Sequence, residues 1–201
     1  MTLRYQFFEL IRLTIIFLAL ALTAPYSAKA LEKECNIVHP SIDYKSKCGT
    51  RYTESISKAL NKGDCFEVEV KADSKWNASG IRLDPKGKYD FQIIDEISPW
   101  MDAGIPATPT GWKMDSKEVK EIGFFMKMFL QATEKYRRVP DQHWFYLMGA
   151  TSGTEYKEFP IGSGISGQVV ADGEFCAFAN DLSLMYWNNT GSLRLKVTRS
   201  D

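Results

Sequence analysis

Two stretches of the chain alternate apolar residues with charged or polar ones, and this pattern limits the possible folds more than any other feature. Residues 65–70 read Cys-Phe-Glu-Val-Glu-Val, and residues 89–93 read Tyr-Asp-Phe-Gln-Ile. Alternation with a period of two is typical of a strand that has one face in a core and the other in solvent. Such strands need a second layer to cover their apolar face.

More strands are predicted by short apolar runs that Gly- and Pro-rich turns separate. These runs lie at 81–83, 144–148, 174–179 and 193–197. The longest turn-rich segment is 98–111, which contains Pro99, Pro106 and Pro109, with Trp100 inside it and Trp112 directly after it. Many short strands with turns between them predict an all-β fold, an antiparallel β-sandwich.

One α-helix is predicted to be inserted in this sandwich, over residues 116–136. Asp115 and Glu118 have the spacing of a capping box at its start. Its apolar residues fall on a single helical face, namely Val119, Ile122, Met126, Phe129, Leu130 and Thr133. A second, short helix is expected over 53–60.

The first thirty residues have the features of a secretory signal peptide. Arg4 and Arg12 precede the apolar run 13–24, and Ala28-Lys29-Ala30 has the small-x-small pattern of a cleavage site after Ala30. An uncleaved N-terminal anchor is the alternative. Cleavage leaves 31–64 as an extension packed on the domain and 65–201 as the sandwich domain. We expect a secreted or periplasmic protein with no membrane span after cleavage.

Charge and motifs argue against several classes of function. Without residues 1–30 the chain has 22 basic and 24 acidic residues, a net charge of −2, so we expect no nucleic-acid partner. His39 and His143 lie in no triad or metal-ligand pattern. The segment 162–167 resembles a nucleophile elbow only superficially, because neither register fits Gly-x-Ser-x-Gly. We therefore expect that the protein is not an enzyme.

Four cysteines follow the predicted cleavage site, and their even number in an exported chain predicts two disulfides. Three connectivities are possible, and the sequence does not choose among them. We favour Cys35–Cys48 with Cys65–Cys176. Thiol or metal chemistry is the alternative, although no Cys-x-x-Cys pattern occurs.

The tail, residues 180–192, reads Asn-Asp-Leu-Ser-Leu-Met-Tyr-Trp-Asn-Asn-Thr-Gly-Ser, which has two interpretations. Asp181 offers up to two carboxylate oxygens, and Asn188 and Asn189 offer one amide oxygen each. Hard cations such as Ca²⁺ prefer such ligands, and a polyol is able to complete the shell with two hydroxyls. Tyr186 and Trp187 offer ring faces to a sugar. Alternatively, these residues form only a turn with packed aromatics.

The same tail resembles the C-terminal motif of the PA-I galactophilic lectins, a family of bacterial calcium-dependent galactose-binding lectins. The family pattern is Asn-Asp, a short loop, then aromatic-x-Asn-Asn-Ser/Thr-Gly-Ser and a strand. Weaker similarities occur in the same order upstream, so that the resemblance runs from about Cys65 to the end. They are Trp76–Ile81 with Gly87-x-Tyr89, Trp100–Asp102 with Gly111-Trp112, Trp144–Gly149 and Phe159–Gly164.

The resemblance implies a sandwich of the galactose-binding or jelly-roll type, in which Ca²⁺ bridges protein and sugar. The implied metal ligands are the side chains of Asp181, Asn188 and Asn189 and the backbone carbonyls of Met185 and Ala103. The implied carbohydrate contacts are Asp181, Asn189, Trp187 and Gln142. The ligand would be a galactose-containing glycan or another polyol, and homo-oligomer formation is left open.

The alternative function is a non-catalytic interaction module of the cell envelope that kept the sandwich and lost sugar binding. In that case the 98–112 loop and the N-terminal extension form a protein interface. The helix inserted at 116–136 has no counterpart in the lectin pattern, so its effect on the pocket is not implied by the resemblance.

Overall fold

A computed structural model describes residues 35–39, 48, 58–153, 156–168 and 172–201. One compact unit spans Cys35–Asp201. The expected signal peptide, most of the expected extension and most of the helix expected over 53–60 lie outside the described residues. The described end of that last segment is not helical, because Lys58–Ala59 forms strand β2.

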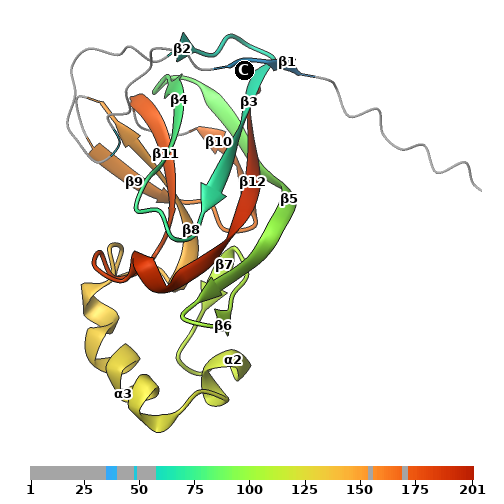
Figure 1. The fold of residues 1–201 in the computed structure, drawn as a ribbon. Coiled ribbons are helices and arrows are strands. Elements are labelled where there is room, and N and C mark those ends of the chain that lie inside the picture. Colours follow the sequence, from blue (N-terminus) through green and yellow to red (C-terminus); the bar gives the residue numbers. More distant parts are fainter. Residues whose placement is uncertain (1–34, 40–47, 49–57, 154–155, 169–171) are drawn as a thin grey trace, which may run out of the picture. The chain divides into compact units, whose positions relative to one another are not determined.

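Two sheets build the unit, and the first has the strand order β1-β3-β12-β5-β10, with β6 paired to β5 (Figure 1). Its strands are β1 (Asn36–Ile37), β3 (Asp64–Lys71), β5 (Lys88–Asp102), β6 (Ile105–Pro106), β10 (Gly164–Gln168) and β12 (Asn189–Arg199). The long strands β5 and β12 pair antiparallel along most of their length.

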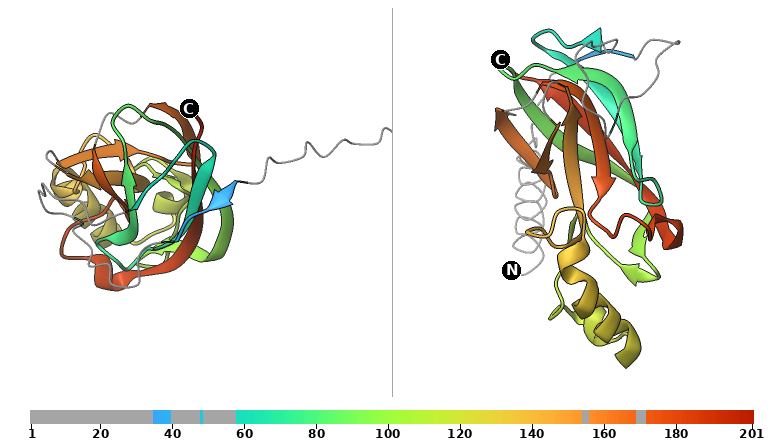
Figure 2. Two further views of the ribbon diagram at one scale, coloured as in Figure 1. Left: turned by 90° about the horizontal axis from the view of Figure 1, so that it is seen from above. Right: turned by 90° about the vertical axis from the view of Figure 1, so that its left-hand side faces the viewer.

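The second sheet has the order β2-β4-β11-β8-β7, with β9 paired to β8. Its remaining strands are β4 (Asn77–Leu83), β7 (Thr110–Trp112), β8 (Trp144–Ser152), β9 (Tyr156–Pro160) and β11 (Gly173–Ala179). The two sheets pack face to face (Figure 2).

The alternating pattern predicted from residues 65–70 is confirmed in β3. Phe66, Val68 and Val70 are buried, and Glu67 and Glu69 are exposed. Phe175 of β11 packs across the two sheets, with its ring 5.9 Å from that of Phe66. The all-β sandwich is therefore confirmed, and its core lies where the period-two pattern places it.

Two details differ from a purely antiparallel sandwich. The edge strands β1 and β2 pair in parallel with β3 and β4, so both sheets are mixed. The segment 98–112 is also less of a loop than expected, since β5 continues to Asp102 and β6 and β7 follow. Pairing with β12 extends β5, and such non-local pairing leaves no trace in local composition.

The helix predicted over 116–136 is interrupted. It consists of α2 (Lys117–Lys120), α3 (Phe124–Thr133) and the 3₁₀ helix η1 (Glu134–Tyr136), with Gly123 preceding α3 in an extended conformation. Ser116, and not Asp115, caps α2 by accepting from the Val119 amide. Glycine interrupts helices because it loses more backbone entropy than other residues. Within the described residues, no helix has the length and apolar character needed to cross a membrane.

All four cysteines form disulfides, as predicted, but the favoured pairing is wrong. The bonds are Cys35–Cys65 and Cys48–Cys176. β1 runs beside the start of β3, with Ile37 opposite Cys65, and this places Cys35 within bonding reach. A parallel edge strand of two residues gives no sequence signal, so the favoured pairing of near neighbours had no structural basis.

Candidate metal centre

The ends of β5 and β12 bring two residues of the site together. In the antiparallel ladder Asp102, the last residue of β5, lies opposite Asn189, the first residue of β12. The strands approach so closely here that a Cβ added to Gly191 would lie 1.9 Å from the Pro99 carbonyl oxygen. Gly191 has a φ of 100° and stands at a register shift between Thr190 and Ser192, where no other residue would fit without strain.

A tight turn directly after Asp102 positions the predicted backbone ligand. Ala103 and Gly104 connect Asp102 to Ile105, with φ of 47° and 84°. Two central residues with positive φ are typical of a type I′ hairpin turn. Alanine pays a conformational cost there, and such backbone strain is found more often at functional sites than elsewhere.

The loop between β11 and β12 carries the remaining predicted ligands and is held at its start by buried hydrogen bonds. The Asn180 side chain accepts from the Val139 amide and donates to the carbonyl oxygens of Val139, Gln142 and His143. The Arg138 amide donates to the Asp181 carbonyl oxygen over 3.1 Å. The loop is therefore anchored on both sides of Asp181.

Tyr186 supports the same loop with its buried side chain. It belongs to the 3₁₀ helix η2 (Tyr186–Asn188), accepts a hydrogen bond from the Arg138 guanidinium and donates one to the Ala179 carbonyl oxygen. Arg138 in turn stacks on Phe178, with its guanidinium carbon 3.4 Å from the ring centroid. Tyr186 is 4% exposed and thus supports the loop. Its hydroxyl is committed to these two partners.

Asp181 and Asn189 are in direct contact inside this frame. The Asn189 Nδ2 donates to Asp181 Oδ2 over 2.9 Å and to the Ala72 carbonyl oxygen over 3.3 Å. The Leu182 amide donates to Asp181 Oδ1 over 2.6 Å. Because both amide hydrogens of Asn189 have acceptors, its oxygen Oδ1 is oriented away from them.

Three oxygen atoms in this cluster are buried and accept no hydrogen bond from any described residue. They are Asp102 Oδ2, Asn188 Oδ1 and Asn189 Oδ1. Asp102, Ala103, Asp181, Met185 and Asn188 also line one common cavity of about 40 Å³. Buried acceptors are nearly always satisfied in folded proteins, so this group fits a ligand that donates hydrogen bonds or carries positive charge.

The electrostatics of the cluster also favour a bound positive charge. Asp102 is 5% exposed and Asp181 is 2% exposed. Burial, and then the negative charge of Asp181, raise the pKa of Asp102 to about 7. Burial also raises the pKa of Asp181, opposed by the hydrogen bonds from Asn189 and Leu182. Within the part of the chain that the structure describes, no lysine, arginine or histidine forms an ion pair with either carboxylate.

These residues fit a hard divalent cation. Carboxylates, amide oxygens and backbone carbonyls are the ligands of Ca²⁺, which takes six to eight of them. The structure brings Asp181, Met185, Asn188, Asn189 and Ala103 to one place, as the lectin resemblance implies. It adds Asp102, which gives the cluster a second carboxylate.

Asp102 was missed because the sequence interpretation placed it inside the turn-rich segment 98–111. One signal was available: Asp102 directly precedes Ala103, whose carbonyl was already a predicted ligand. The pairing of Asp102 with Asn189 depends on an 87-residue sequence separation and has no local signature.

Trp187 and Gln142 are two of the four residues expected to contact a sugar, and neither lines the cavity. Trp187 is 77% exposed and does not line the cavity. The backbone of Gln142 is held in the turn before β8, where its amide donates to Val139 and its carbonyl accepts from Asn180. Gln142 does not line the cavity either.

Helix α3 instead supplies the remaining wall of the cavity. Met126, Phe129 and Leu130 line it together with the oxygen ligands. Apolar side chains on this wall offer no hydrogen bonds to the hydroxyl groups of a polyol. The inserted helix, which has no counterpart in the lectin pattern, therefore forms part of the cavity wall.

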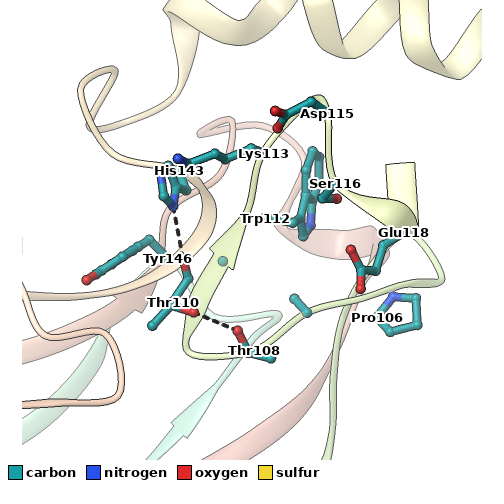
Figure 3. A pocket seen from close by; sticks show the side chains of 12 residues that line it. Pro106, Thr108, Thr110, Trp112, Lys113, Asp115, Ser116, Glu118, His143 and Tyr146 are labelled. Atoms are coloured by element: carbon teal, nitrogen blue, oxygen red, sulfur yellow. Dashed lines mark hydrogen bonds between the residues drawn. The ribbon is translucent and has the colours of Figure 1, made fainter. Parts of the chain in front are cut away.

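A second concave surface lies near β7 and the start of α2. It is a groove of about 520 Å³ (Figure 3). The groove is lined by Pro106, Ala107, Thr108, Thr110, Gly111, Trp112, Lys113, Asp115, Ser116, Glu118, His143 and Tyr146. His143 Nδ1 lies 3.2 Å from the Thr110 carbonyl oxygen, and the Thr108 and Thr110 hydroxyls are 2.8 Å apart. The groove combines the partly exposed rings of His143 and Tyr146 with hydroxyls and both signs of charge.

Another cluster of metal-ligand types does not fit a cation. Cys48, Glu174 and Cys176 lie close together, but both sulfur atoms are bonded to each other in a disulfide. A disulfide sulfur carries no charge and is not a thiolate ligand. Calcium, in addition, prefers oxygen.

Comparison with known proteins yields a distant structural likeness. The sequence matches no family model and no curated protein. Among solved structures, the EclA N-terminal domain, described as a PllA-like lectin, aligns with a TM-score of 0.42 and 16% identity. The alignment covers 67% of this chain and 94% of that domain. At this TM-score the likeness carries no argument about the site, and the all-β sandwich stands on the sheets described above.

Proposed function

We propose that the protein is a lectin-like module that binds calcium through Asp102, Asp181, Asn188 and Asn189 and the carbonyls of Ala103 and Met185. The observation that supports this most is the group of three buried oxygens without donors, one of them on Asp102, next to the buried carboxylate of Asp181. Two carboxylates and a nearly complete shell of protein oxygens lead us to expect a dissociation constant of roughly 10⁻⁵–10⁻⁴ M.

Calcium titration of matched variants tests the proposal. In Asp181→Asn and in Asp102→Asn, loss of one formal charge from the shell should weaken calcium binding at least about tenfold, measured by calorimetry and by the calcium-induced rise in Tm. Asp141→Asn is the control, because Asp141 is exposed and does not line the cavity. Equal calcium responses in all four proteins, or no response in the wild type, would refute the proposal.

Carbohydrate binding is the second part of the proposed function. The lectin resemblance of the tail supports it, and the open groove around His143 and Tyr146 is where we place the ligand, since apolar side chains of α3 line the cation cavity. Sugars bind proteins through ring stacking together with several hydrogen bonds, and the groove offers both. The ligand we propose is a galactose-containing glycan.

A glycan array in the presence of calcium tests this part separately. Binding that Tyr146→Ala abolishes and Asp181→Asn leaves unchanged would place the sugar in the groove. Binding that Asp181→Asn abolishes would place the sugar at the cation instead. If no glycan binds while calcium does, the remaining function is a calcium-bound interaction module of the cell envelope, for which proteins co-purified from envelope extracts are the measurement.

A further inference from the structure

Helix α3 presents a second apolar face, which no part of the described chain covers. Phe124 is 69% exposed, Phe125 85% and Met128 52%. Phe124 and Met128 are one turn apart and form one surface, which Phe125 extends to the side. These three residues are called the apolar tip below.

The apolar tip is separate from the face that serves the cation site. Successive residues of a helix are 100° apart, so Met126 and Leu130 project roughly opposite to Phe124 and Met128. Met126, Phe129 and Leu130 line the cavity, and Phe129 lies between Phe125 and Met126 around the helix. Between Phe124 and Leu130, Lys127 is the one residue that interrupts the apolar surface of the helix. A helix that is apolar on nearly all sides is normally buried, and α3 is buried on one side only.

The position of the apolar tip indicates what kind of surface it meets. α2 and α3 extend beyond one end of the two sheets, and the first turn of α3 lies at the far end of this extension in both views (Figures 1 and 2). A protruding tip presents little contact area to another globular protein, whereas it is able to insert into the interface of a lipid bilayer. α3 has ten residues, half of what a membrane-spanning helix needs, so it would lie at a bilayer interface.

The distribution of charge distinguishes between two possible partners of the apolar tip, a second copy of the chain and a lipid surface. Residues 113–138 carry seven Lys or Arg and four Asp or Glu, a net charge of +3, whereas the remaining residues after 30 carry fifteen and twenty, a net charge of −5. Lys117 and Lys120 are exposed in the segment just before α3, and so are Glu118 and Glu121. α3 itself contains no acidic residue. Two copies of the chain would bring like charges together here, while an anionic lipid surface would attract them.

We propose that the apolar tip inserts into the interface of an anionic phospholipid bilayer, with the surrounding lysines at the level of the lipid phosphates. Phe124, Phe125 and Met128 enter the acyl boundary, and the lysines reach outward from it. The proposal does not depend on the cation site or on a sugar. It gives the module a means to act at a membrane surface without crossing it.

Vesicle co-sedimentation tests the proposal with the chain that lacks residues 1–30. Vesicles of equal parts phosphatidylglycerol and phosphatidylcholine should bind the wild type, and vesicles of phosphatidylcholine alone should bind it several-fold less. Phe124→Ser/Phe125→Ser should lower the partition coefficient by about tenfold or more. Phe124→Leu/Phe125→Leu should retain most of the binding, because it keeps the tip apolar.

Leu184→Ser is the matched control, since Leu184 is 83% exposed and lies outside α3. It should bind vesicles like the wild type. All substituted side chains are exposed, so each variant should keep the wild-type Tm and circular dichroism. Wild type that stays in the supernatant, or a serine double variant that binds equally well, would overturn the proposal. So would a dimer in lipid-free solution that the serine double variant dissociates, since a second copy would then cover the tip.

Discussion

Asp102 and Asp181 are two buried acids in one small space, and each makes the ionised form of the other less favourable. A structural role alone would be served better by an asparagine, which needs no counter-charge. The hydrogen bonds to Asp181 occupy one lone pair on each oxygen and leave others free. At the scale of single residues, the cluster is unfavourable without a cation and well suited to one.

This imbalance predicts how stability depends on pH. The pKa of Asp102 in the folded protein is raised to about 7, above its value in an unfolded chain, so the folded state binds the proton more tightly. The resulting stabilisation is fully present below about pH 4 and is lost as pH rises through 7. In metal-free buffer we expect the contribution of Asp102 to the free energy of unfolding to fall by at most about 4 kcal/mol over this range.

Urea denaturation at pH 5 and pH 8 measures this change. Asp102→Asn should remove most of the difference, and calcium added at pH 8 should restore stability to the wild type only. A wild-type protein that is equally stable at both pH values without metal would contradict the assignment of these two carboxylates to one site.

At the scale of elements, the periodicity of the sequence predicted those strands and helices whose formation depends on nearby residues. The alternation in residues 65–70 and 89–93 correctly placed β3 and the first part of β5, because side chains on opposite faces of a strand meet different surroundings. The tail motif likewise identified a compact loop. Periodicity over 116–136 predicted helix, but it did not reveal that Gly123 divides it or that much of its apolar surface faces solvent.

The close contact between β5 and β12 predicts an unusual sensitivity at one glycine. Gly191→Ala would place a Cβ against the Pro99 carbonyl oxygen and would also force alanine to a φ of 100°. We expect a loss of more than about 2 kcal/mol in the free energy of unfolding, together with weaker calcium binding, because Asn189 would shift.

Gly104→Ala is the comparison for this variant. Gly104 also has a positive φ, but a Cβ there would meet nothing within 4 Å. Its cost should be limited to the backbone conformation, about 1 kcal/mol. Chemical denaturation of both variants separates the two effects, and equal losses would show that the strands are not in close contact at Gly191.

At the scale of the whole molecule, the disulfides join parts that are remote in sequence. Cys35–Cys65 spans 30 residues and Cys48–Cys176 spans 128. In the chain-entropy account, the longer link restricts the unfolded chain more, by about 5 kcal/mol against about 4 kcal/mol. Cys48→Ser/Cys176→Ser should therefore lower the Tm more than Cys35→Ser/Cys65→Ser does.

Peptide mapping without reduction checks the pairing itself. It should recover the linked peptides Cys35–Cys65 and Cys48–Cys176, and a Cys65–Cys176 peptide would contradict the structure. Neither this connectivity nor the position of Asp102 was accessible from the sequence. Both depend on which strands become neighbours in the sheets, and that choice is made by packing over the whole chain.

The pairing of Asp102 with Asn189 has a consequence for how the chain reaches its native state. A shift of the β5–β12 ladder by one residue would turn Asp102 to the opposite face and separate it from Asn189. Such a mispaired chain would expose apolar side chains of one strand and would also separate the proposed calcium ligands. On the proposed function, calcium would bind only chains in which the two longest strands are correctly aligned, and during folding it would select against misaligned ones.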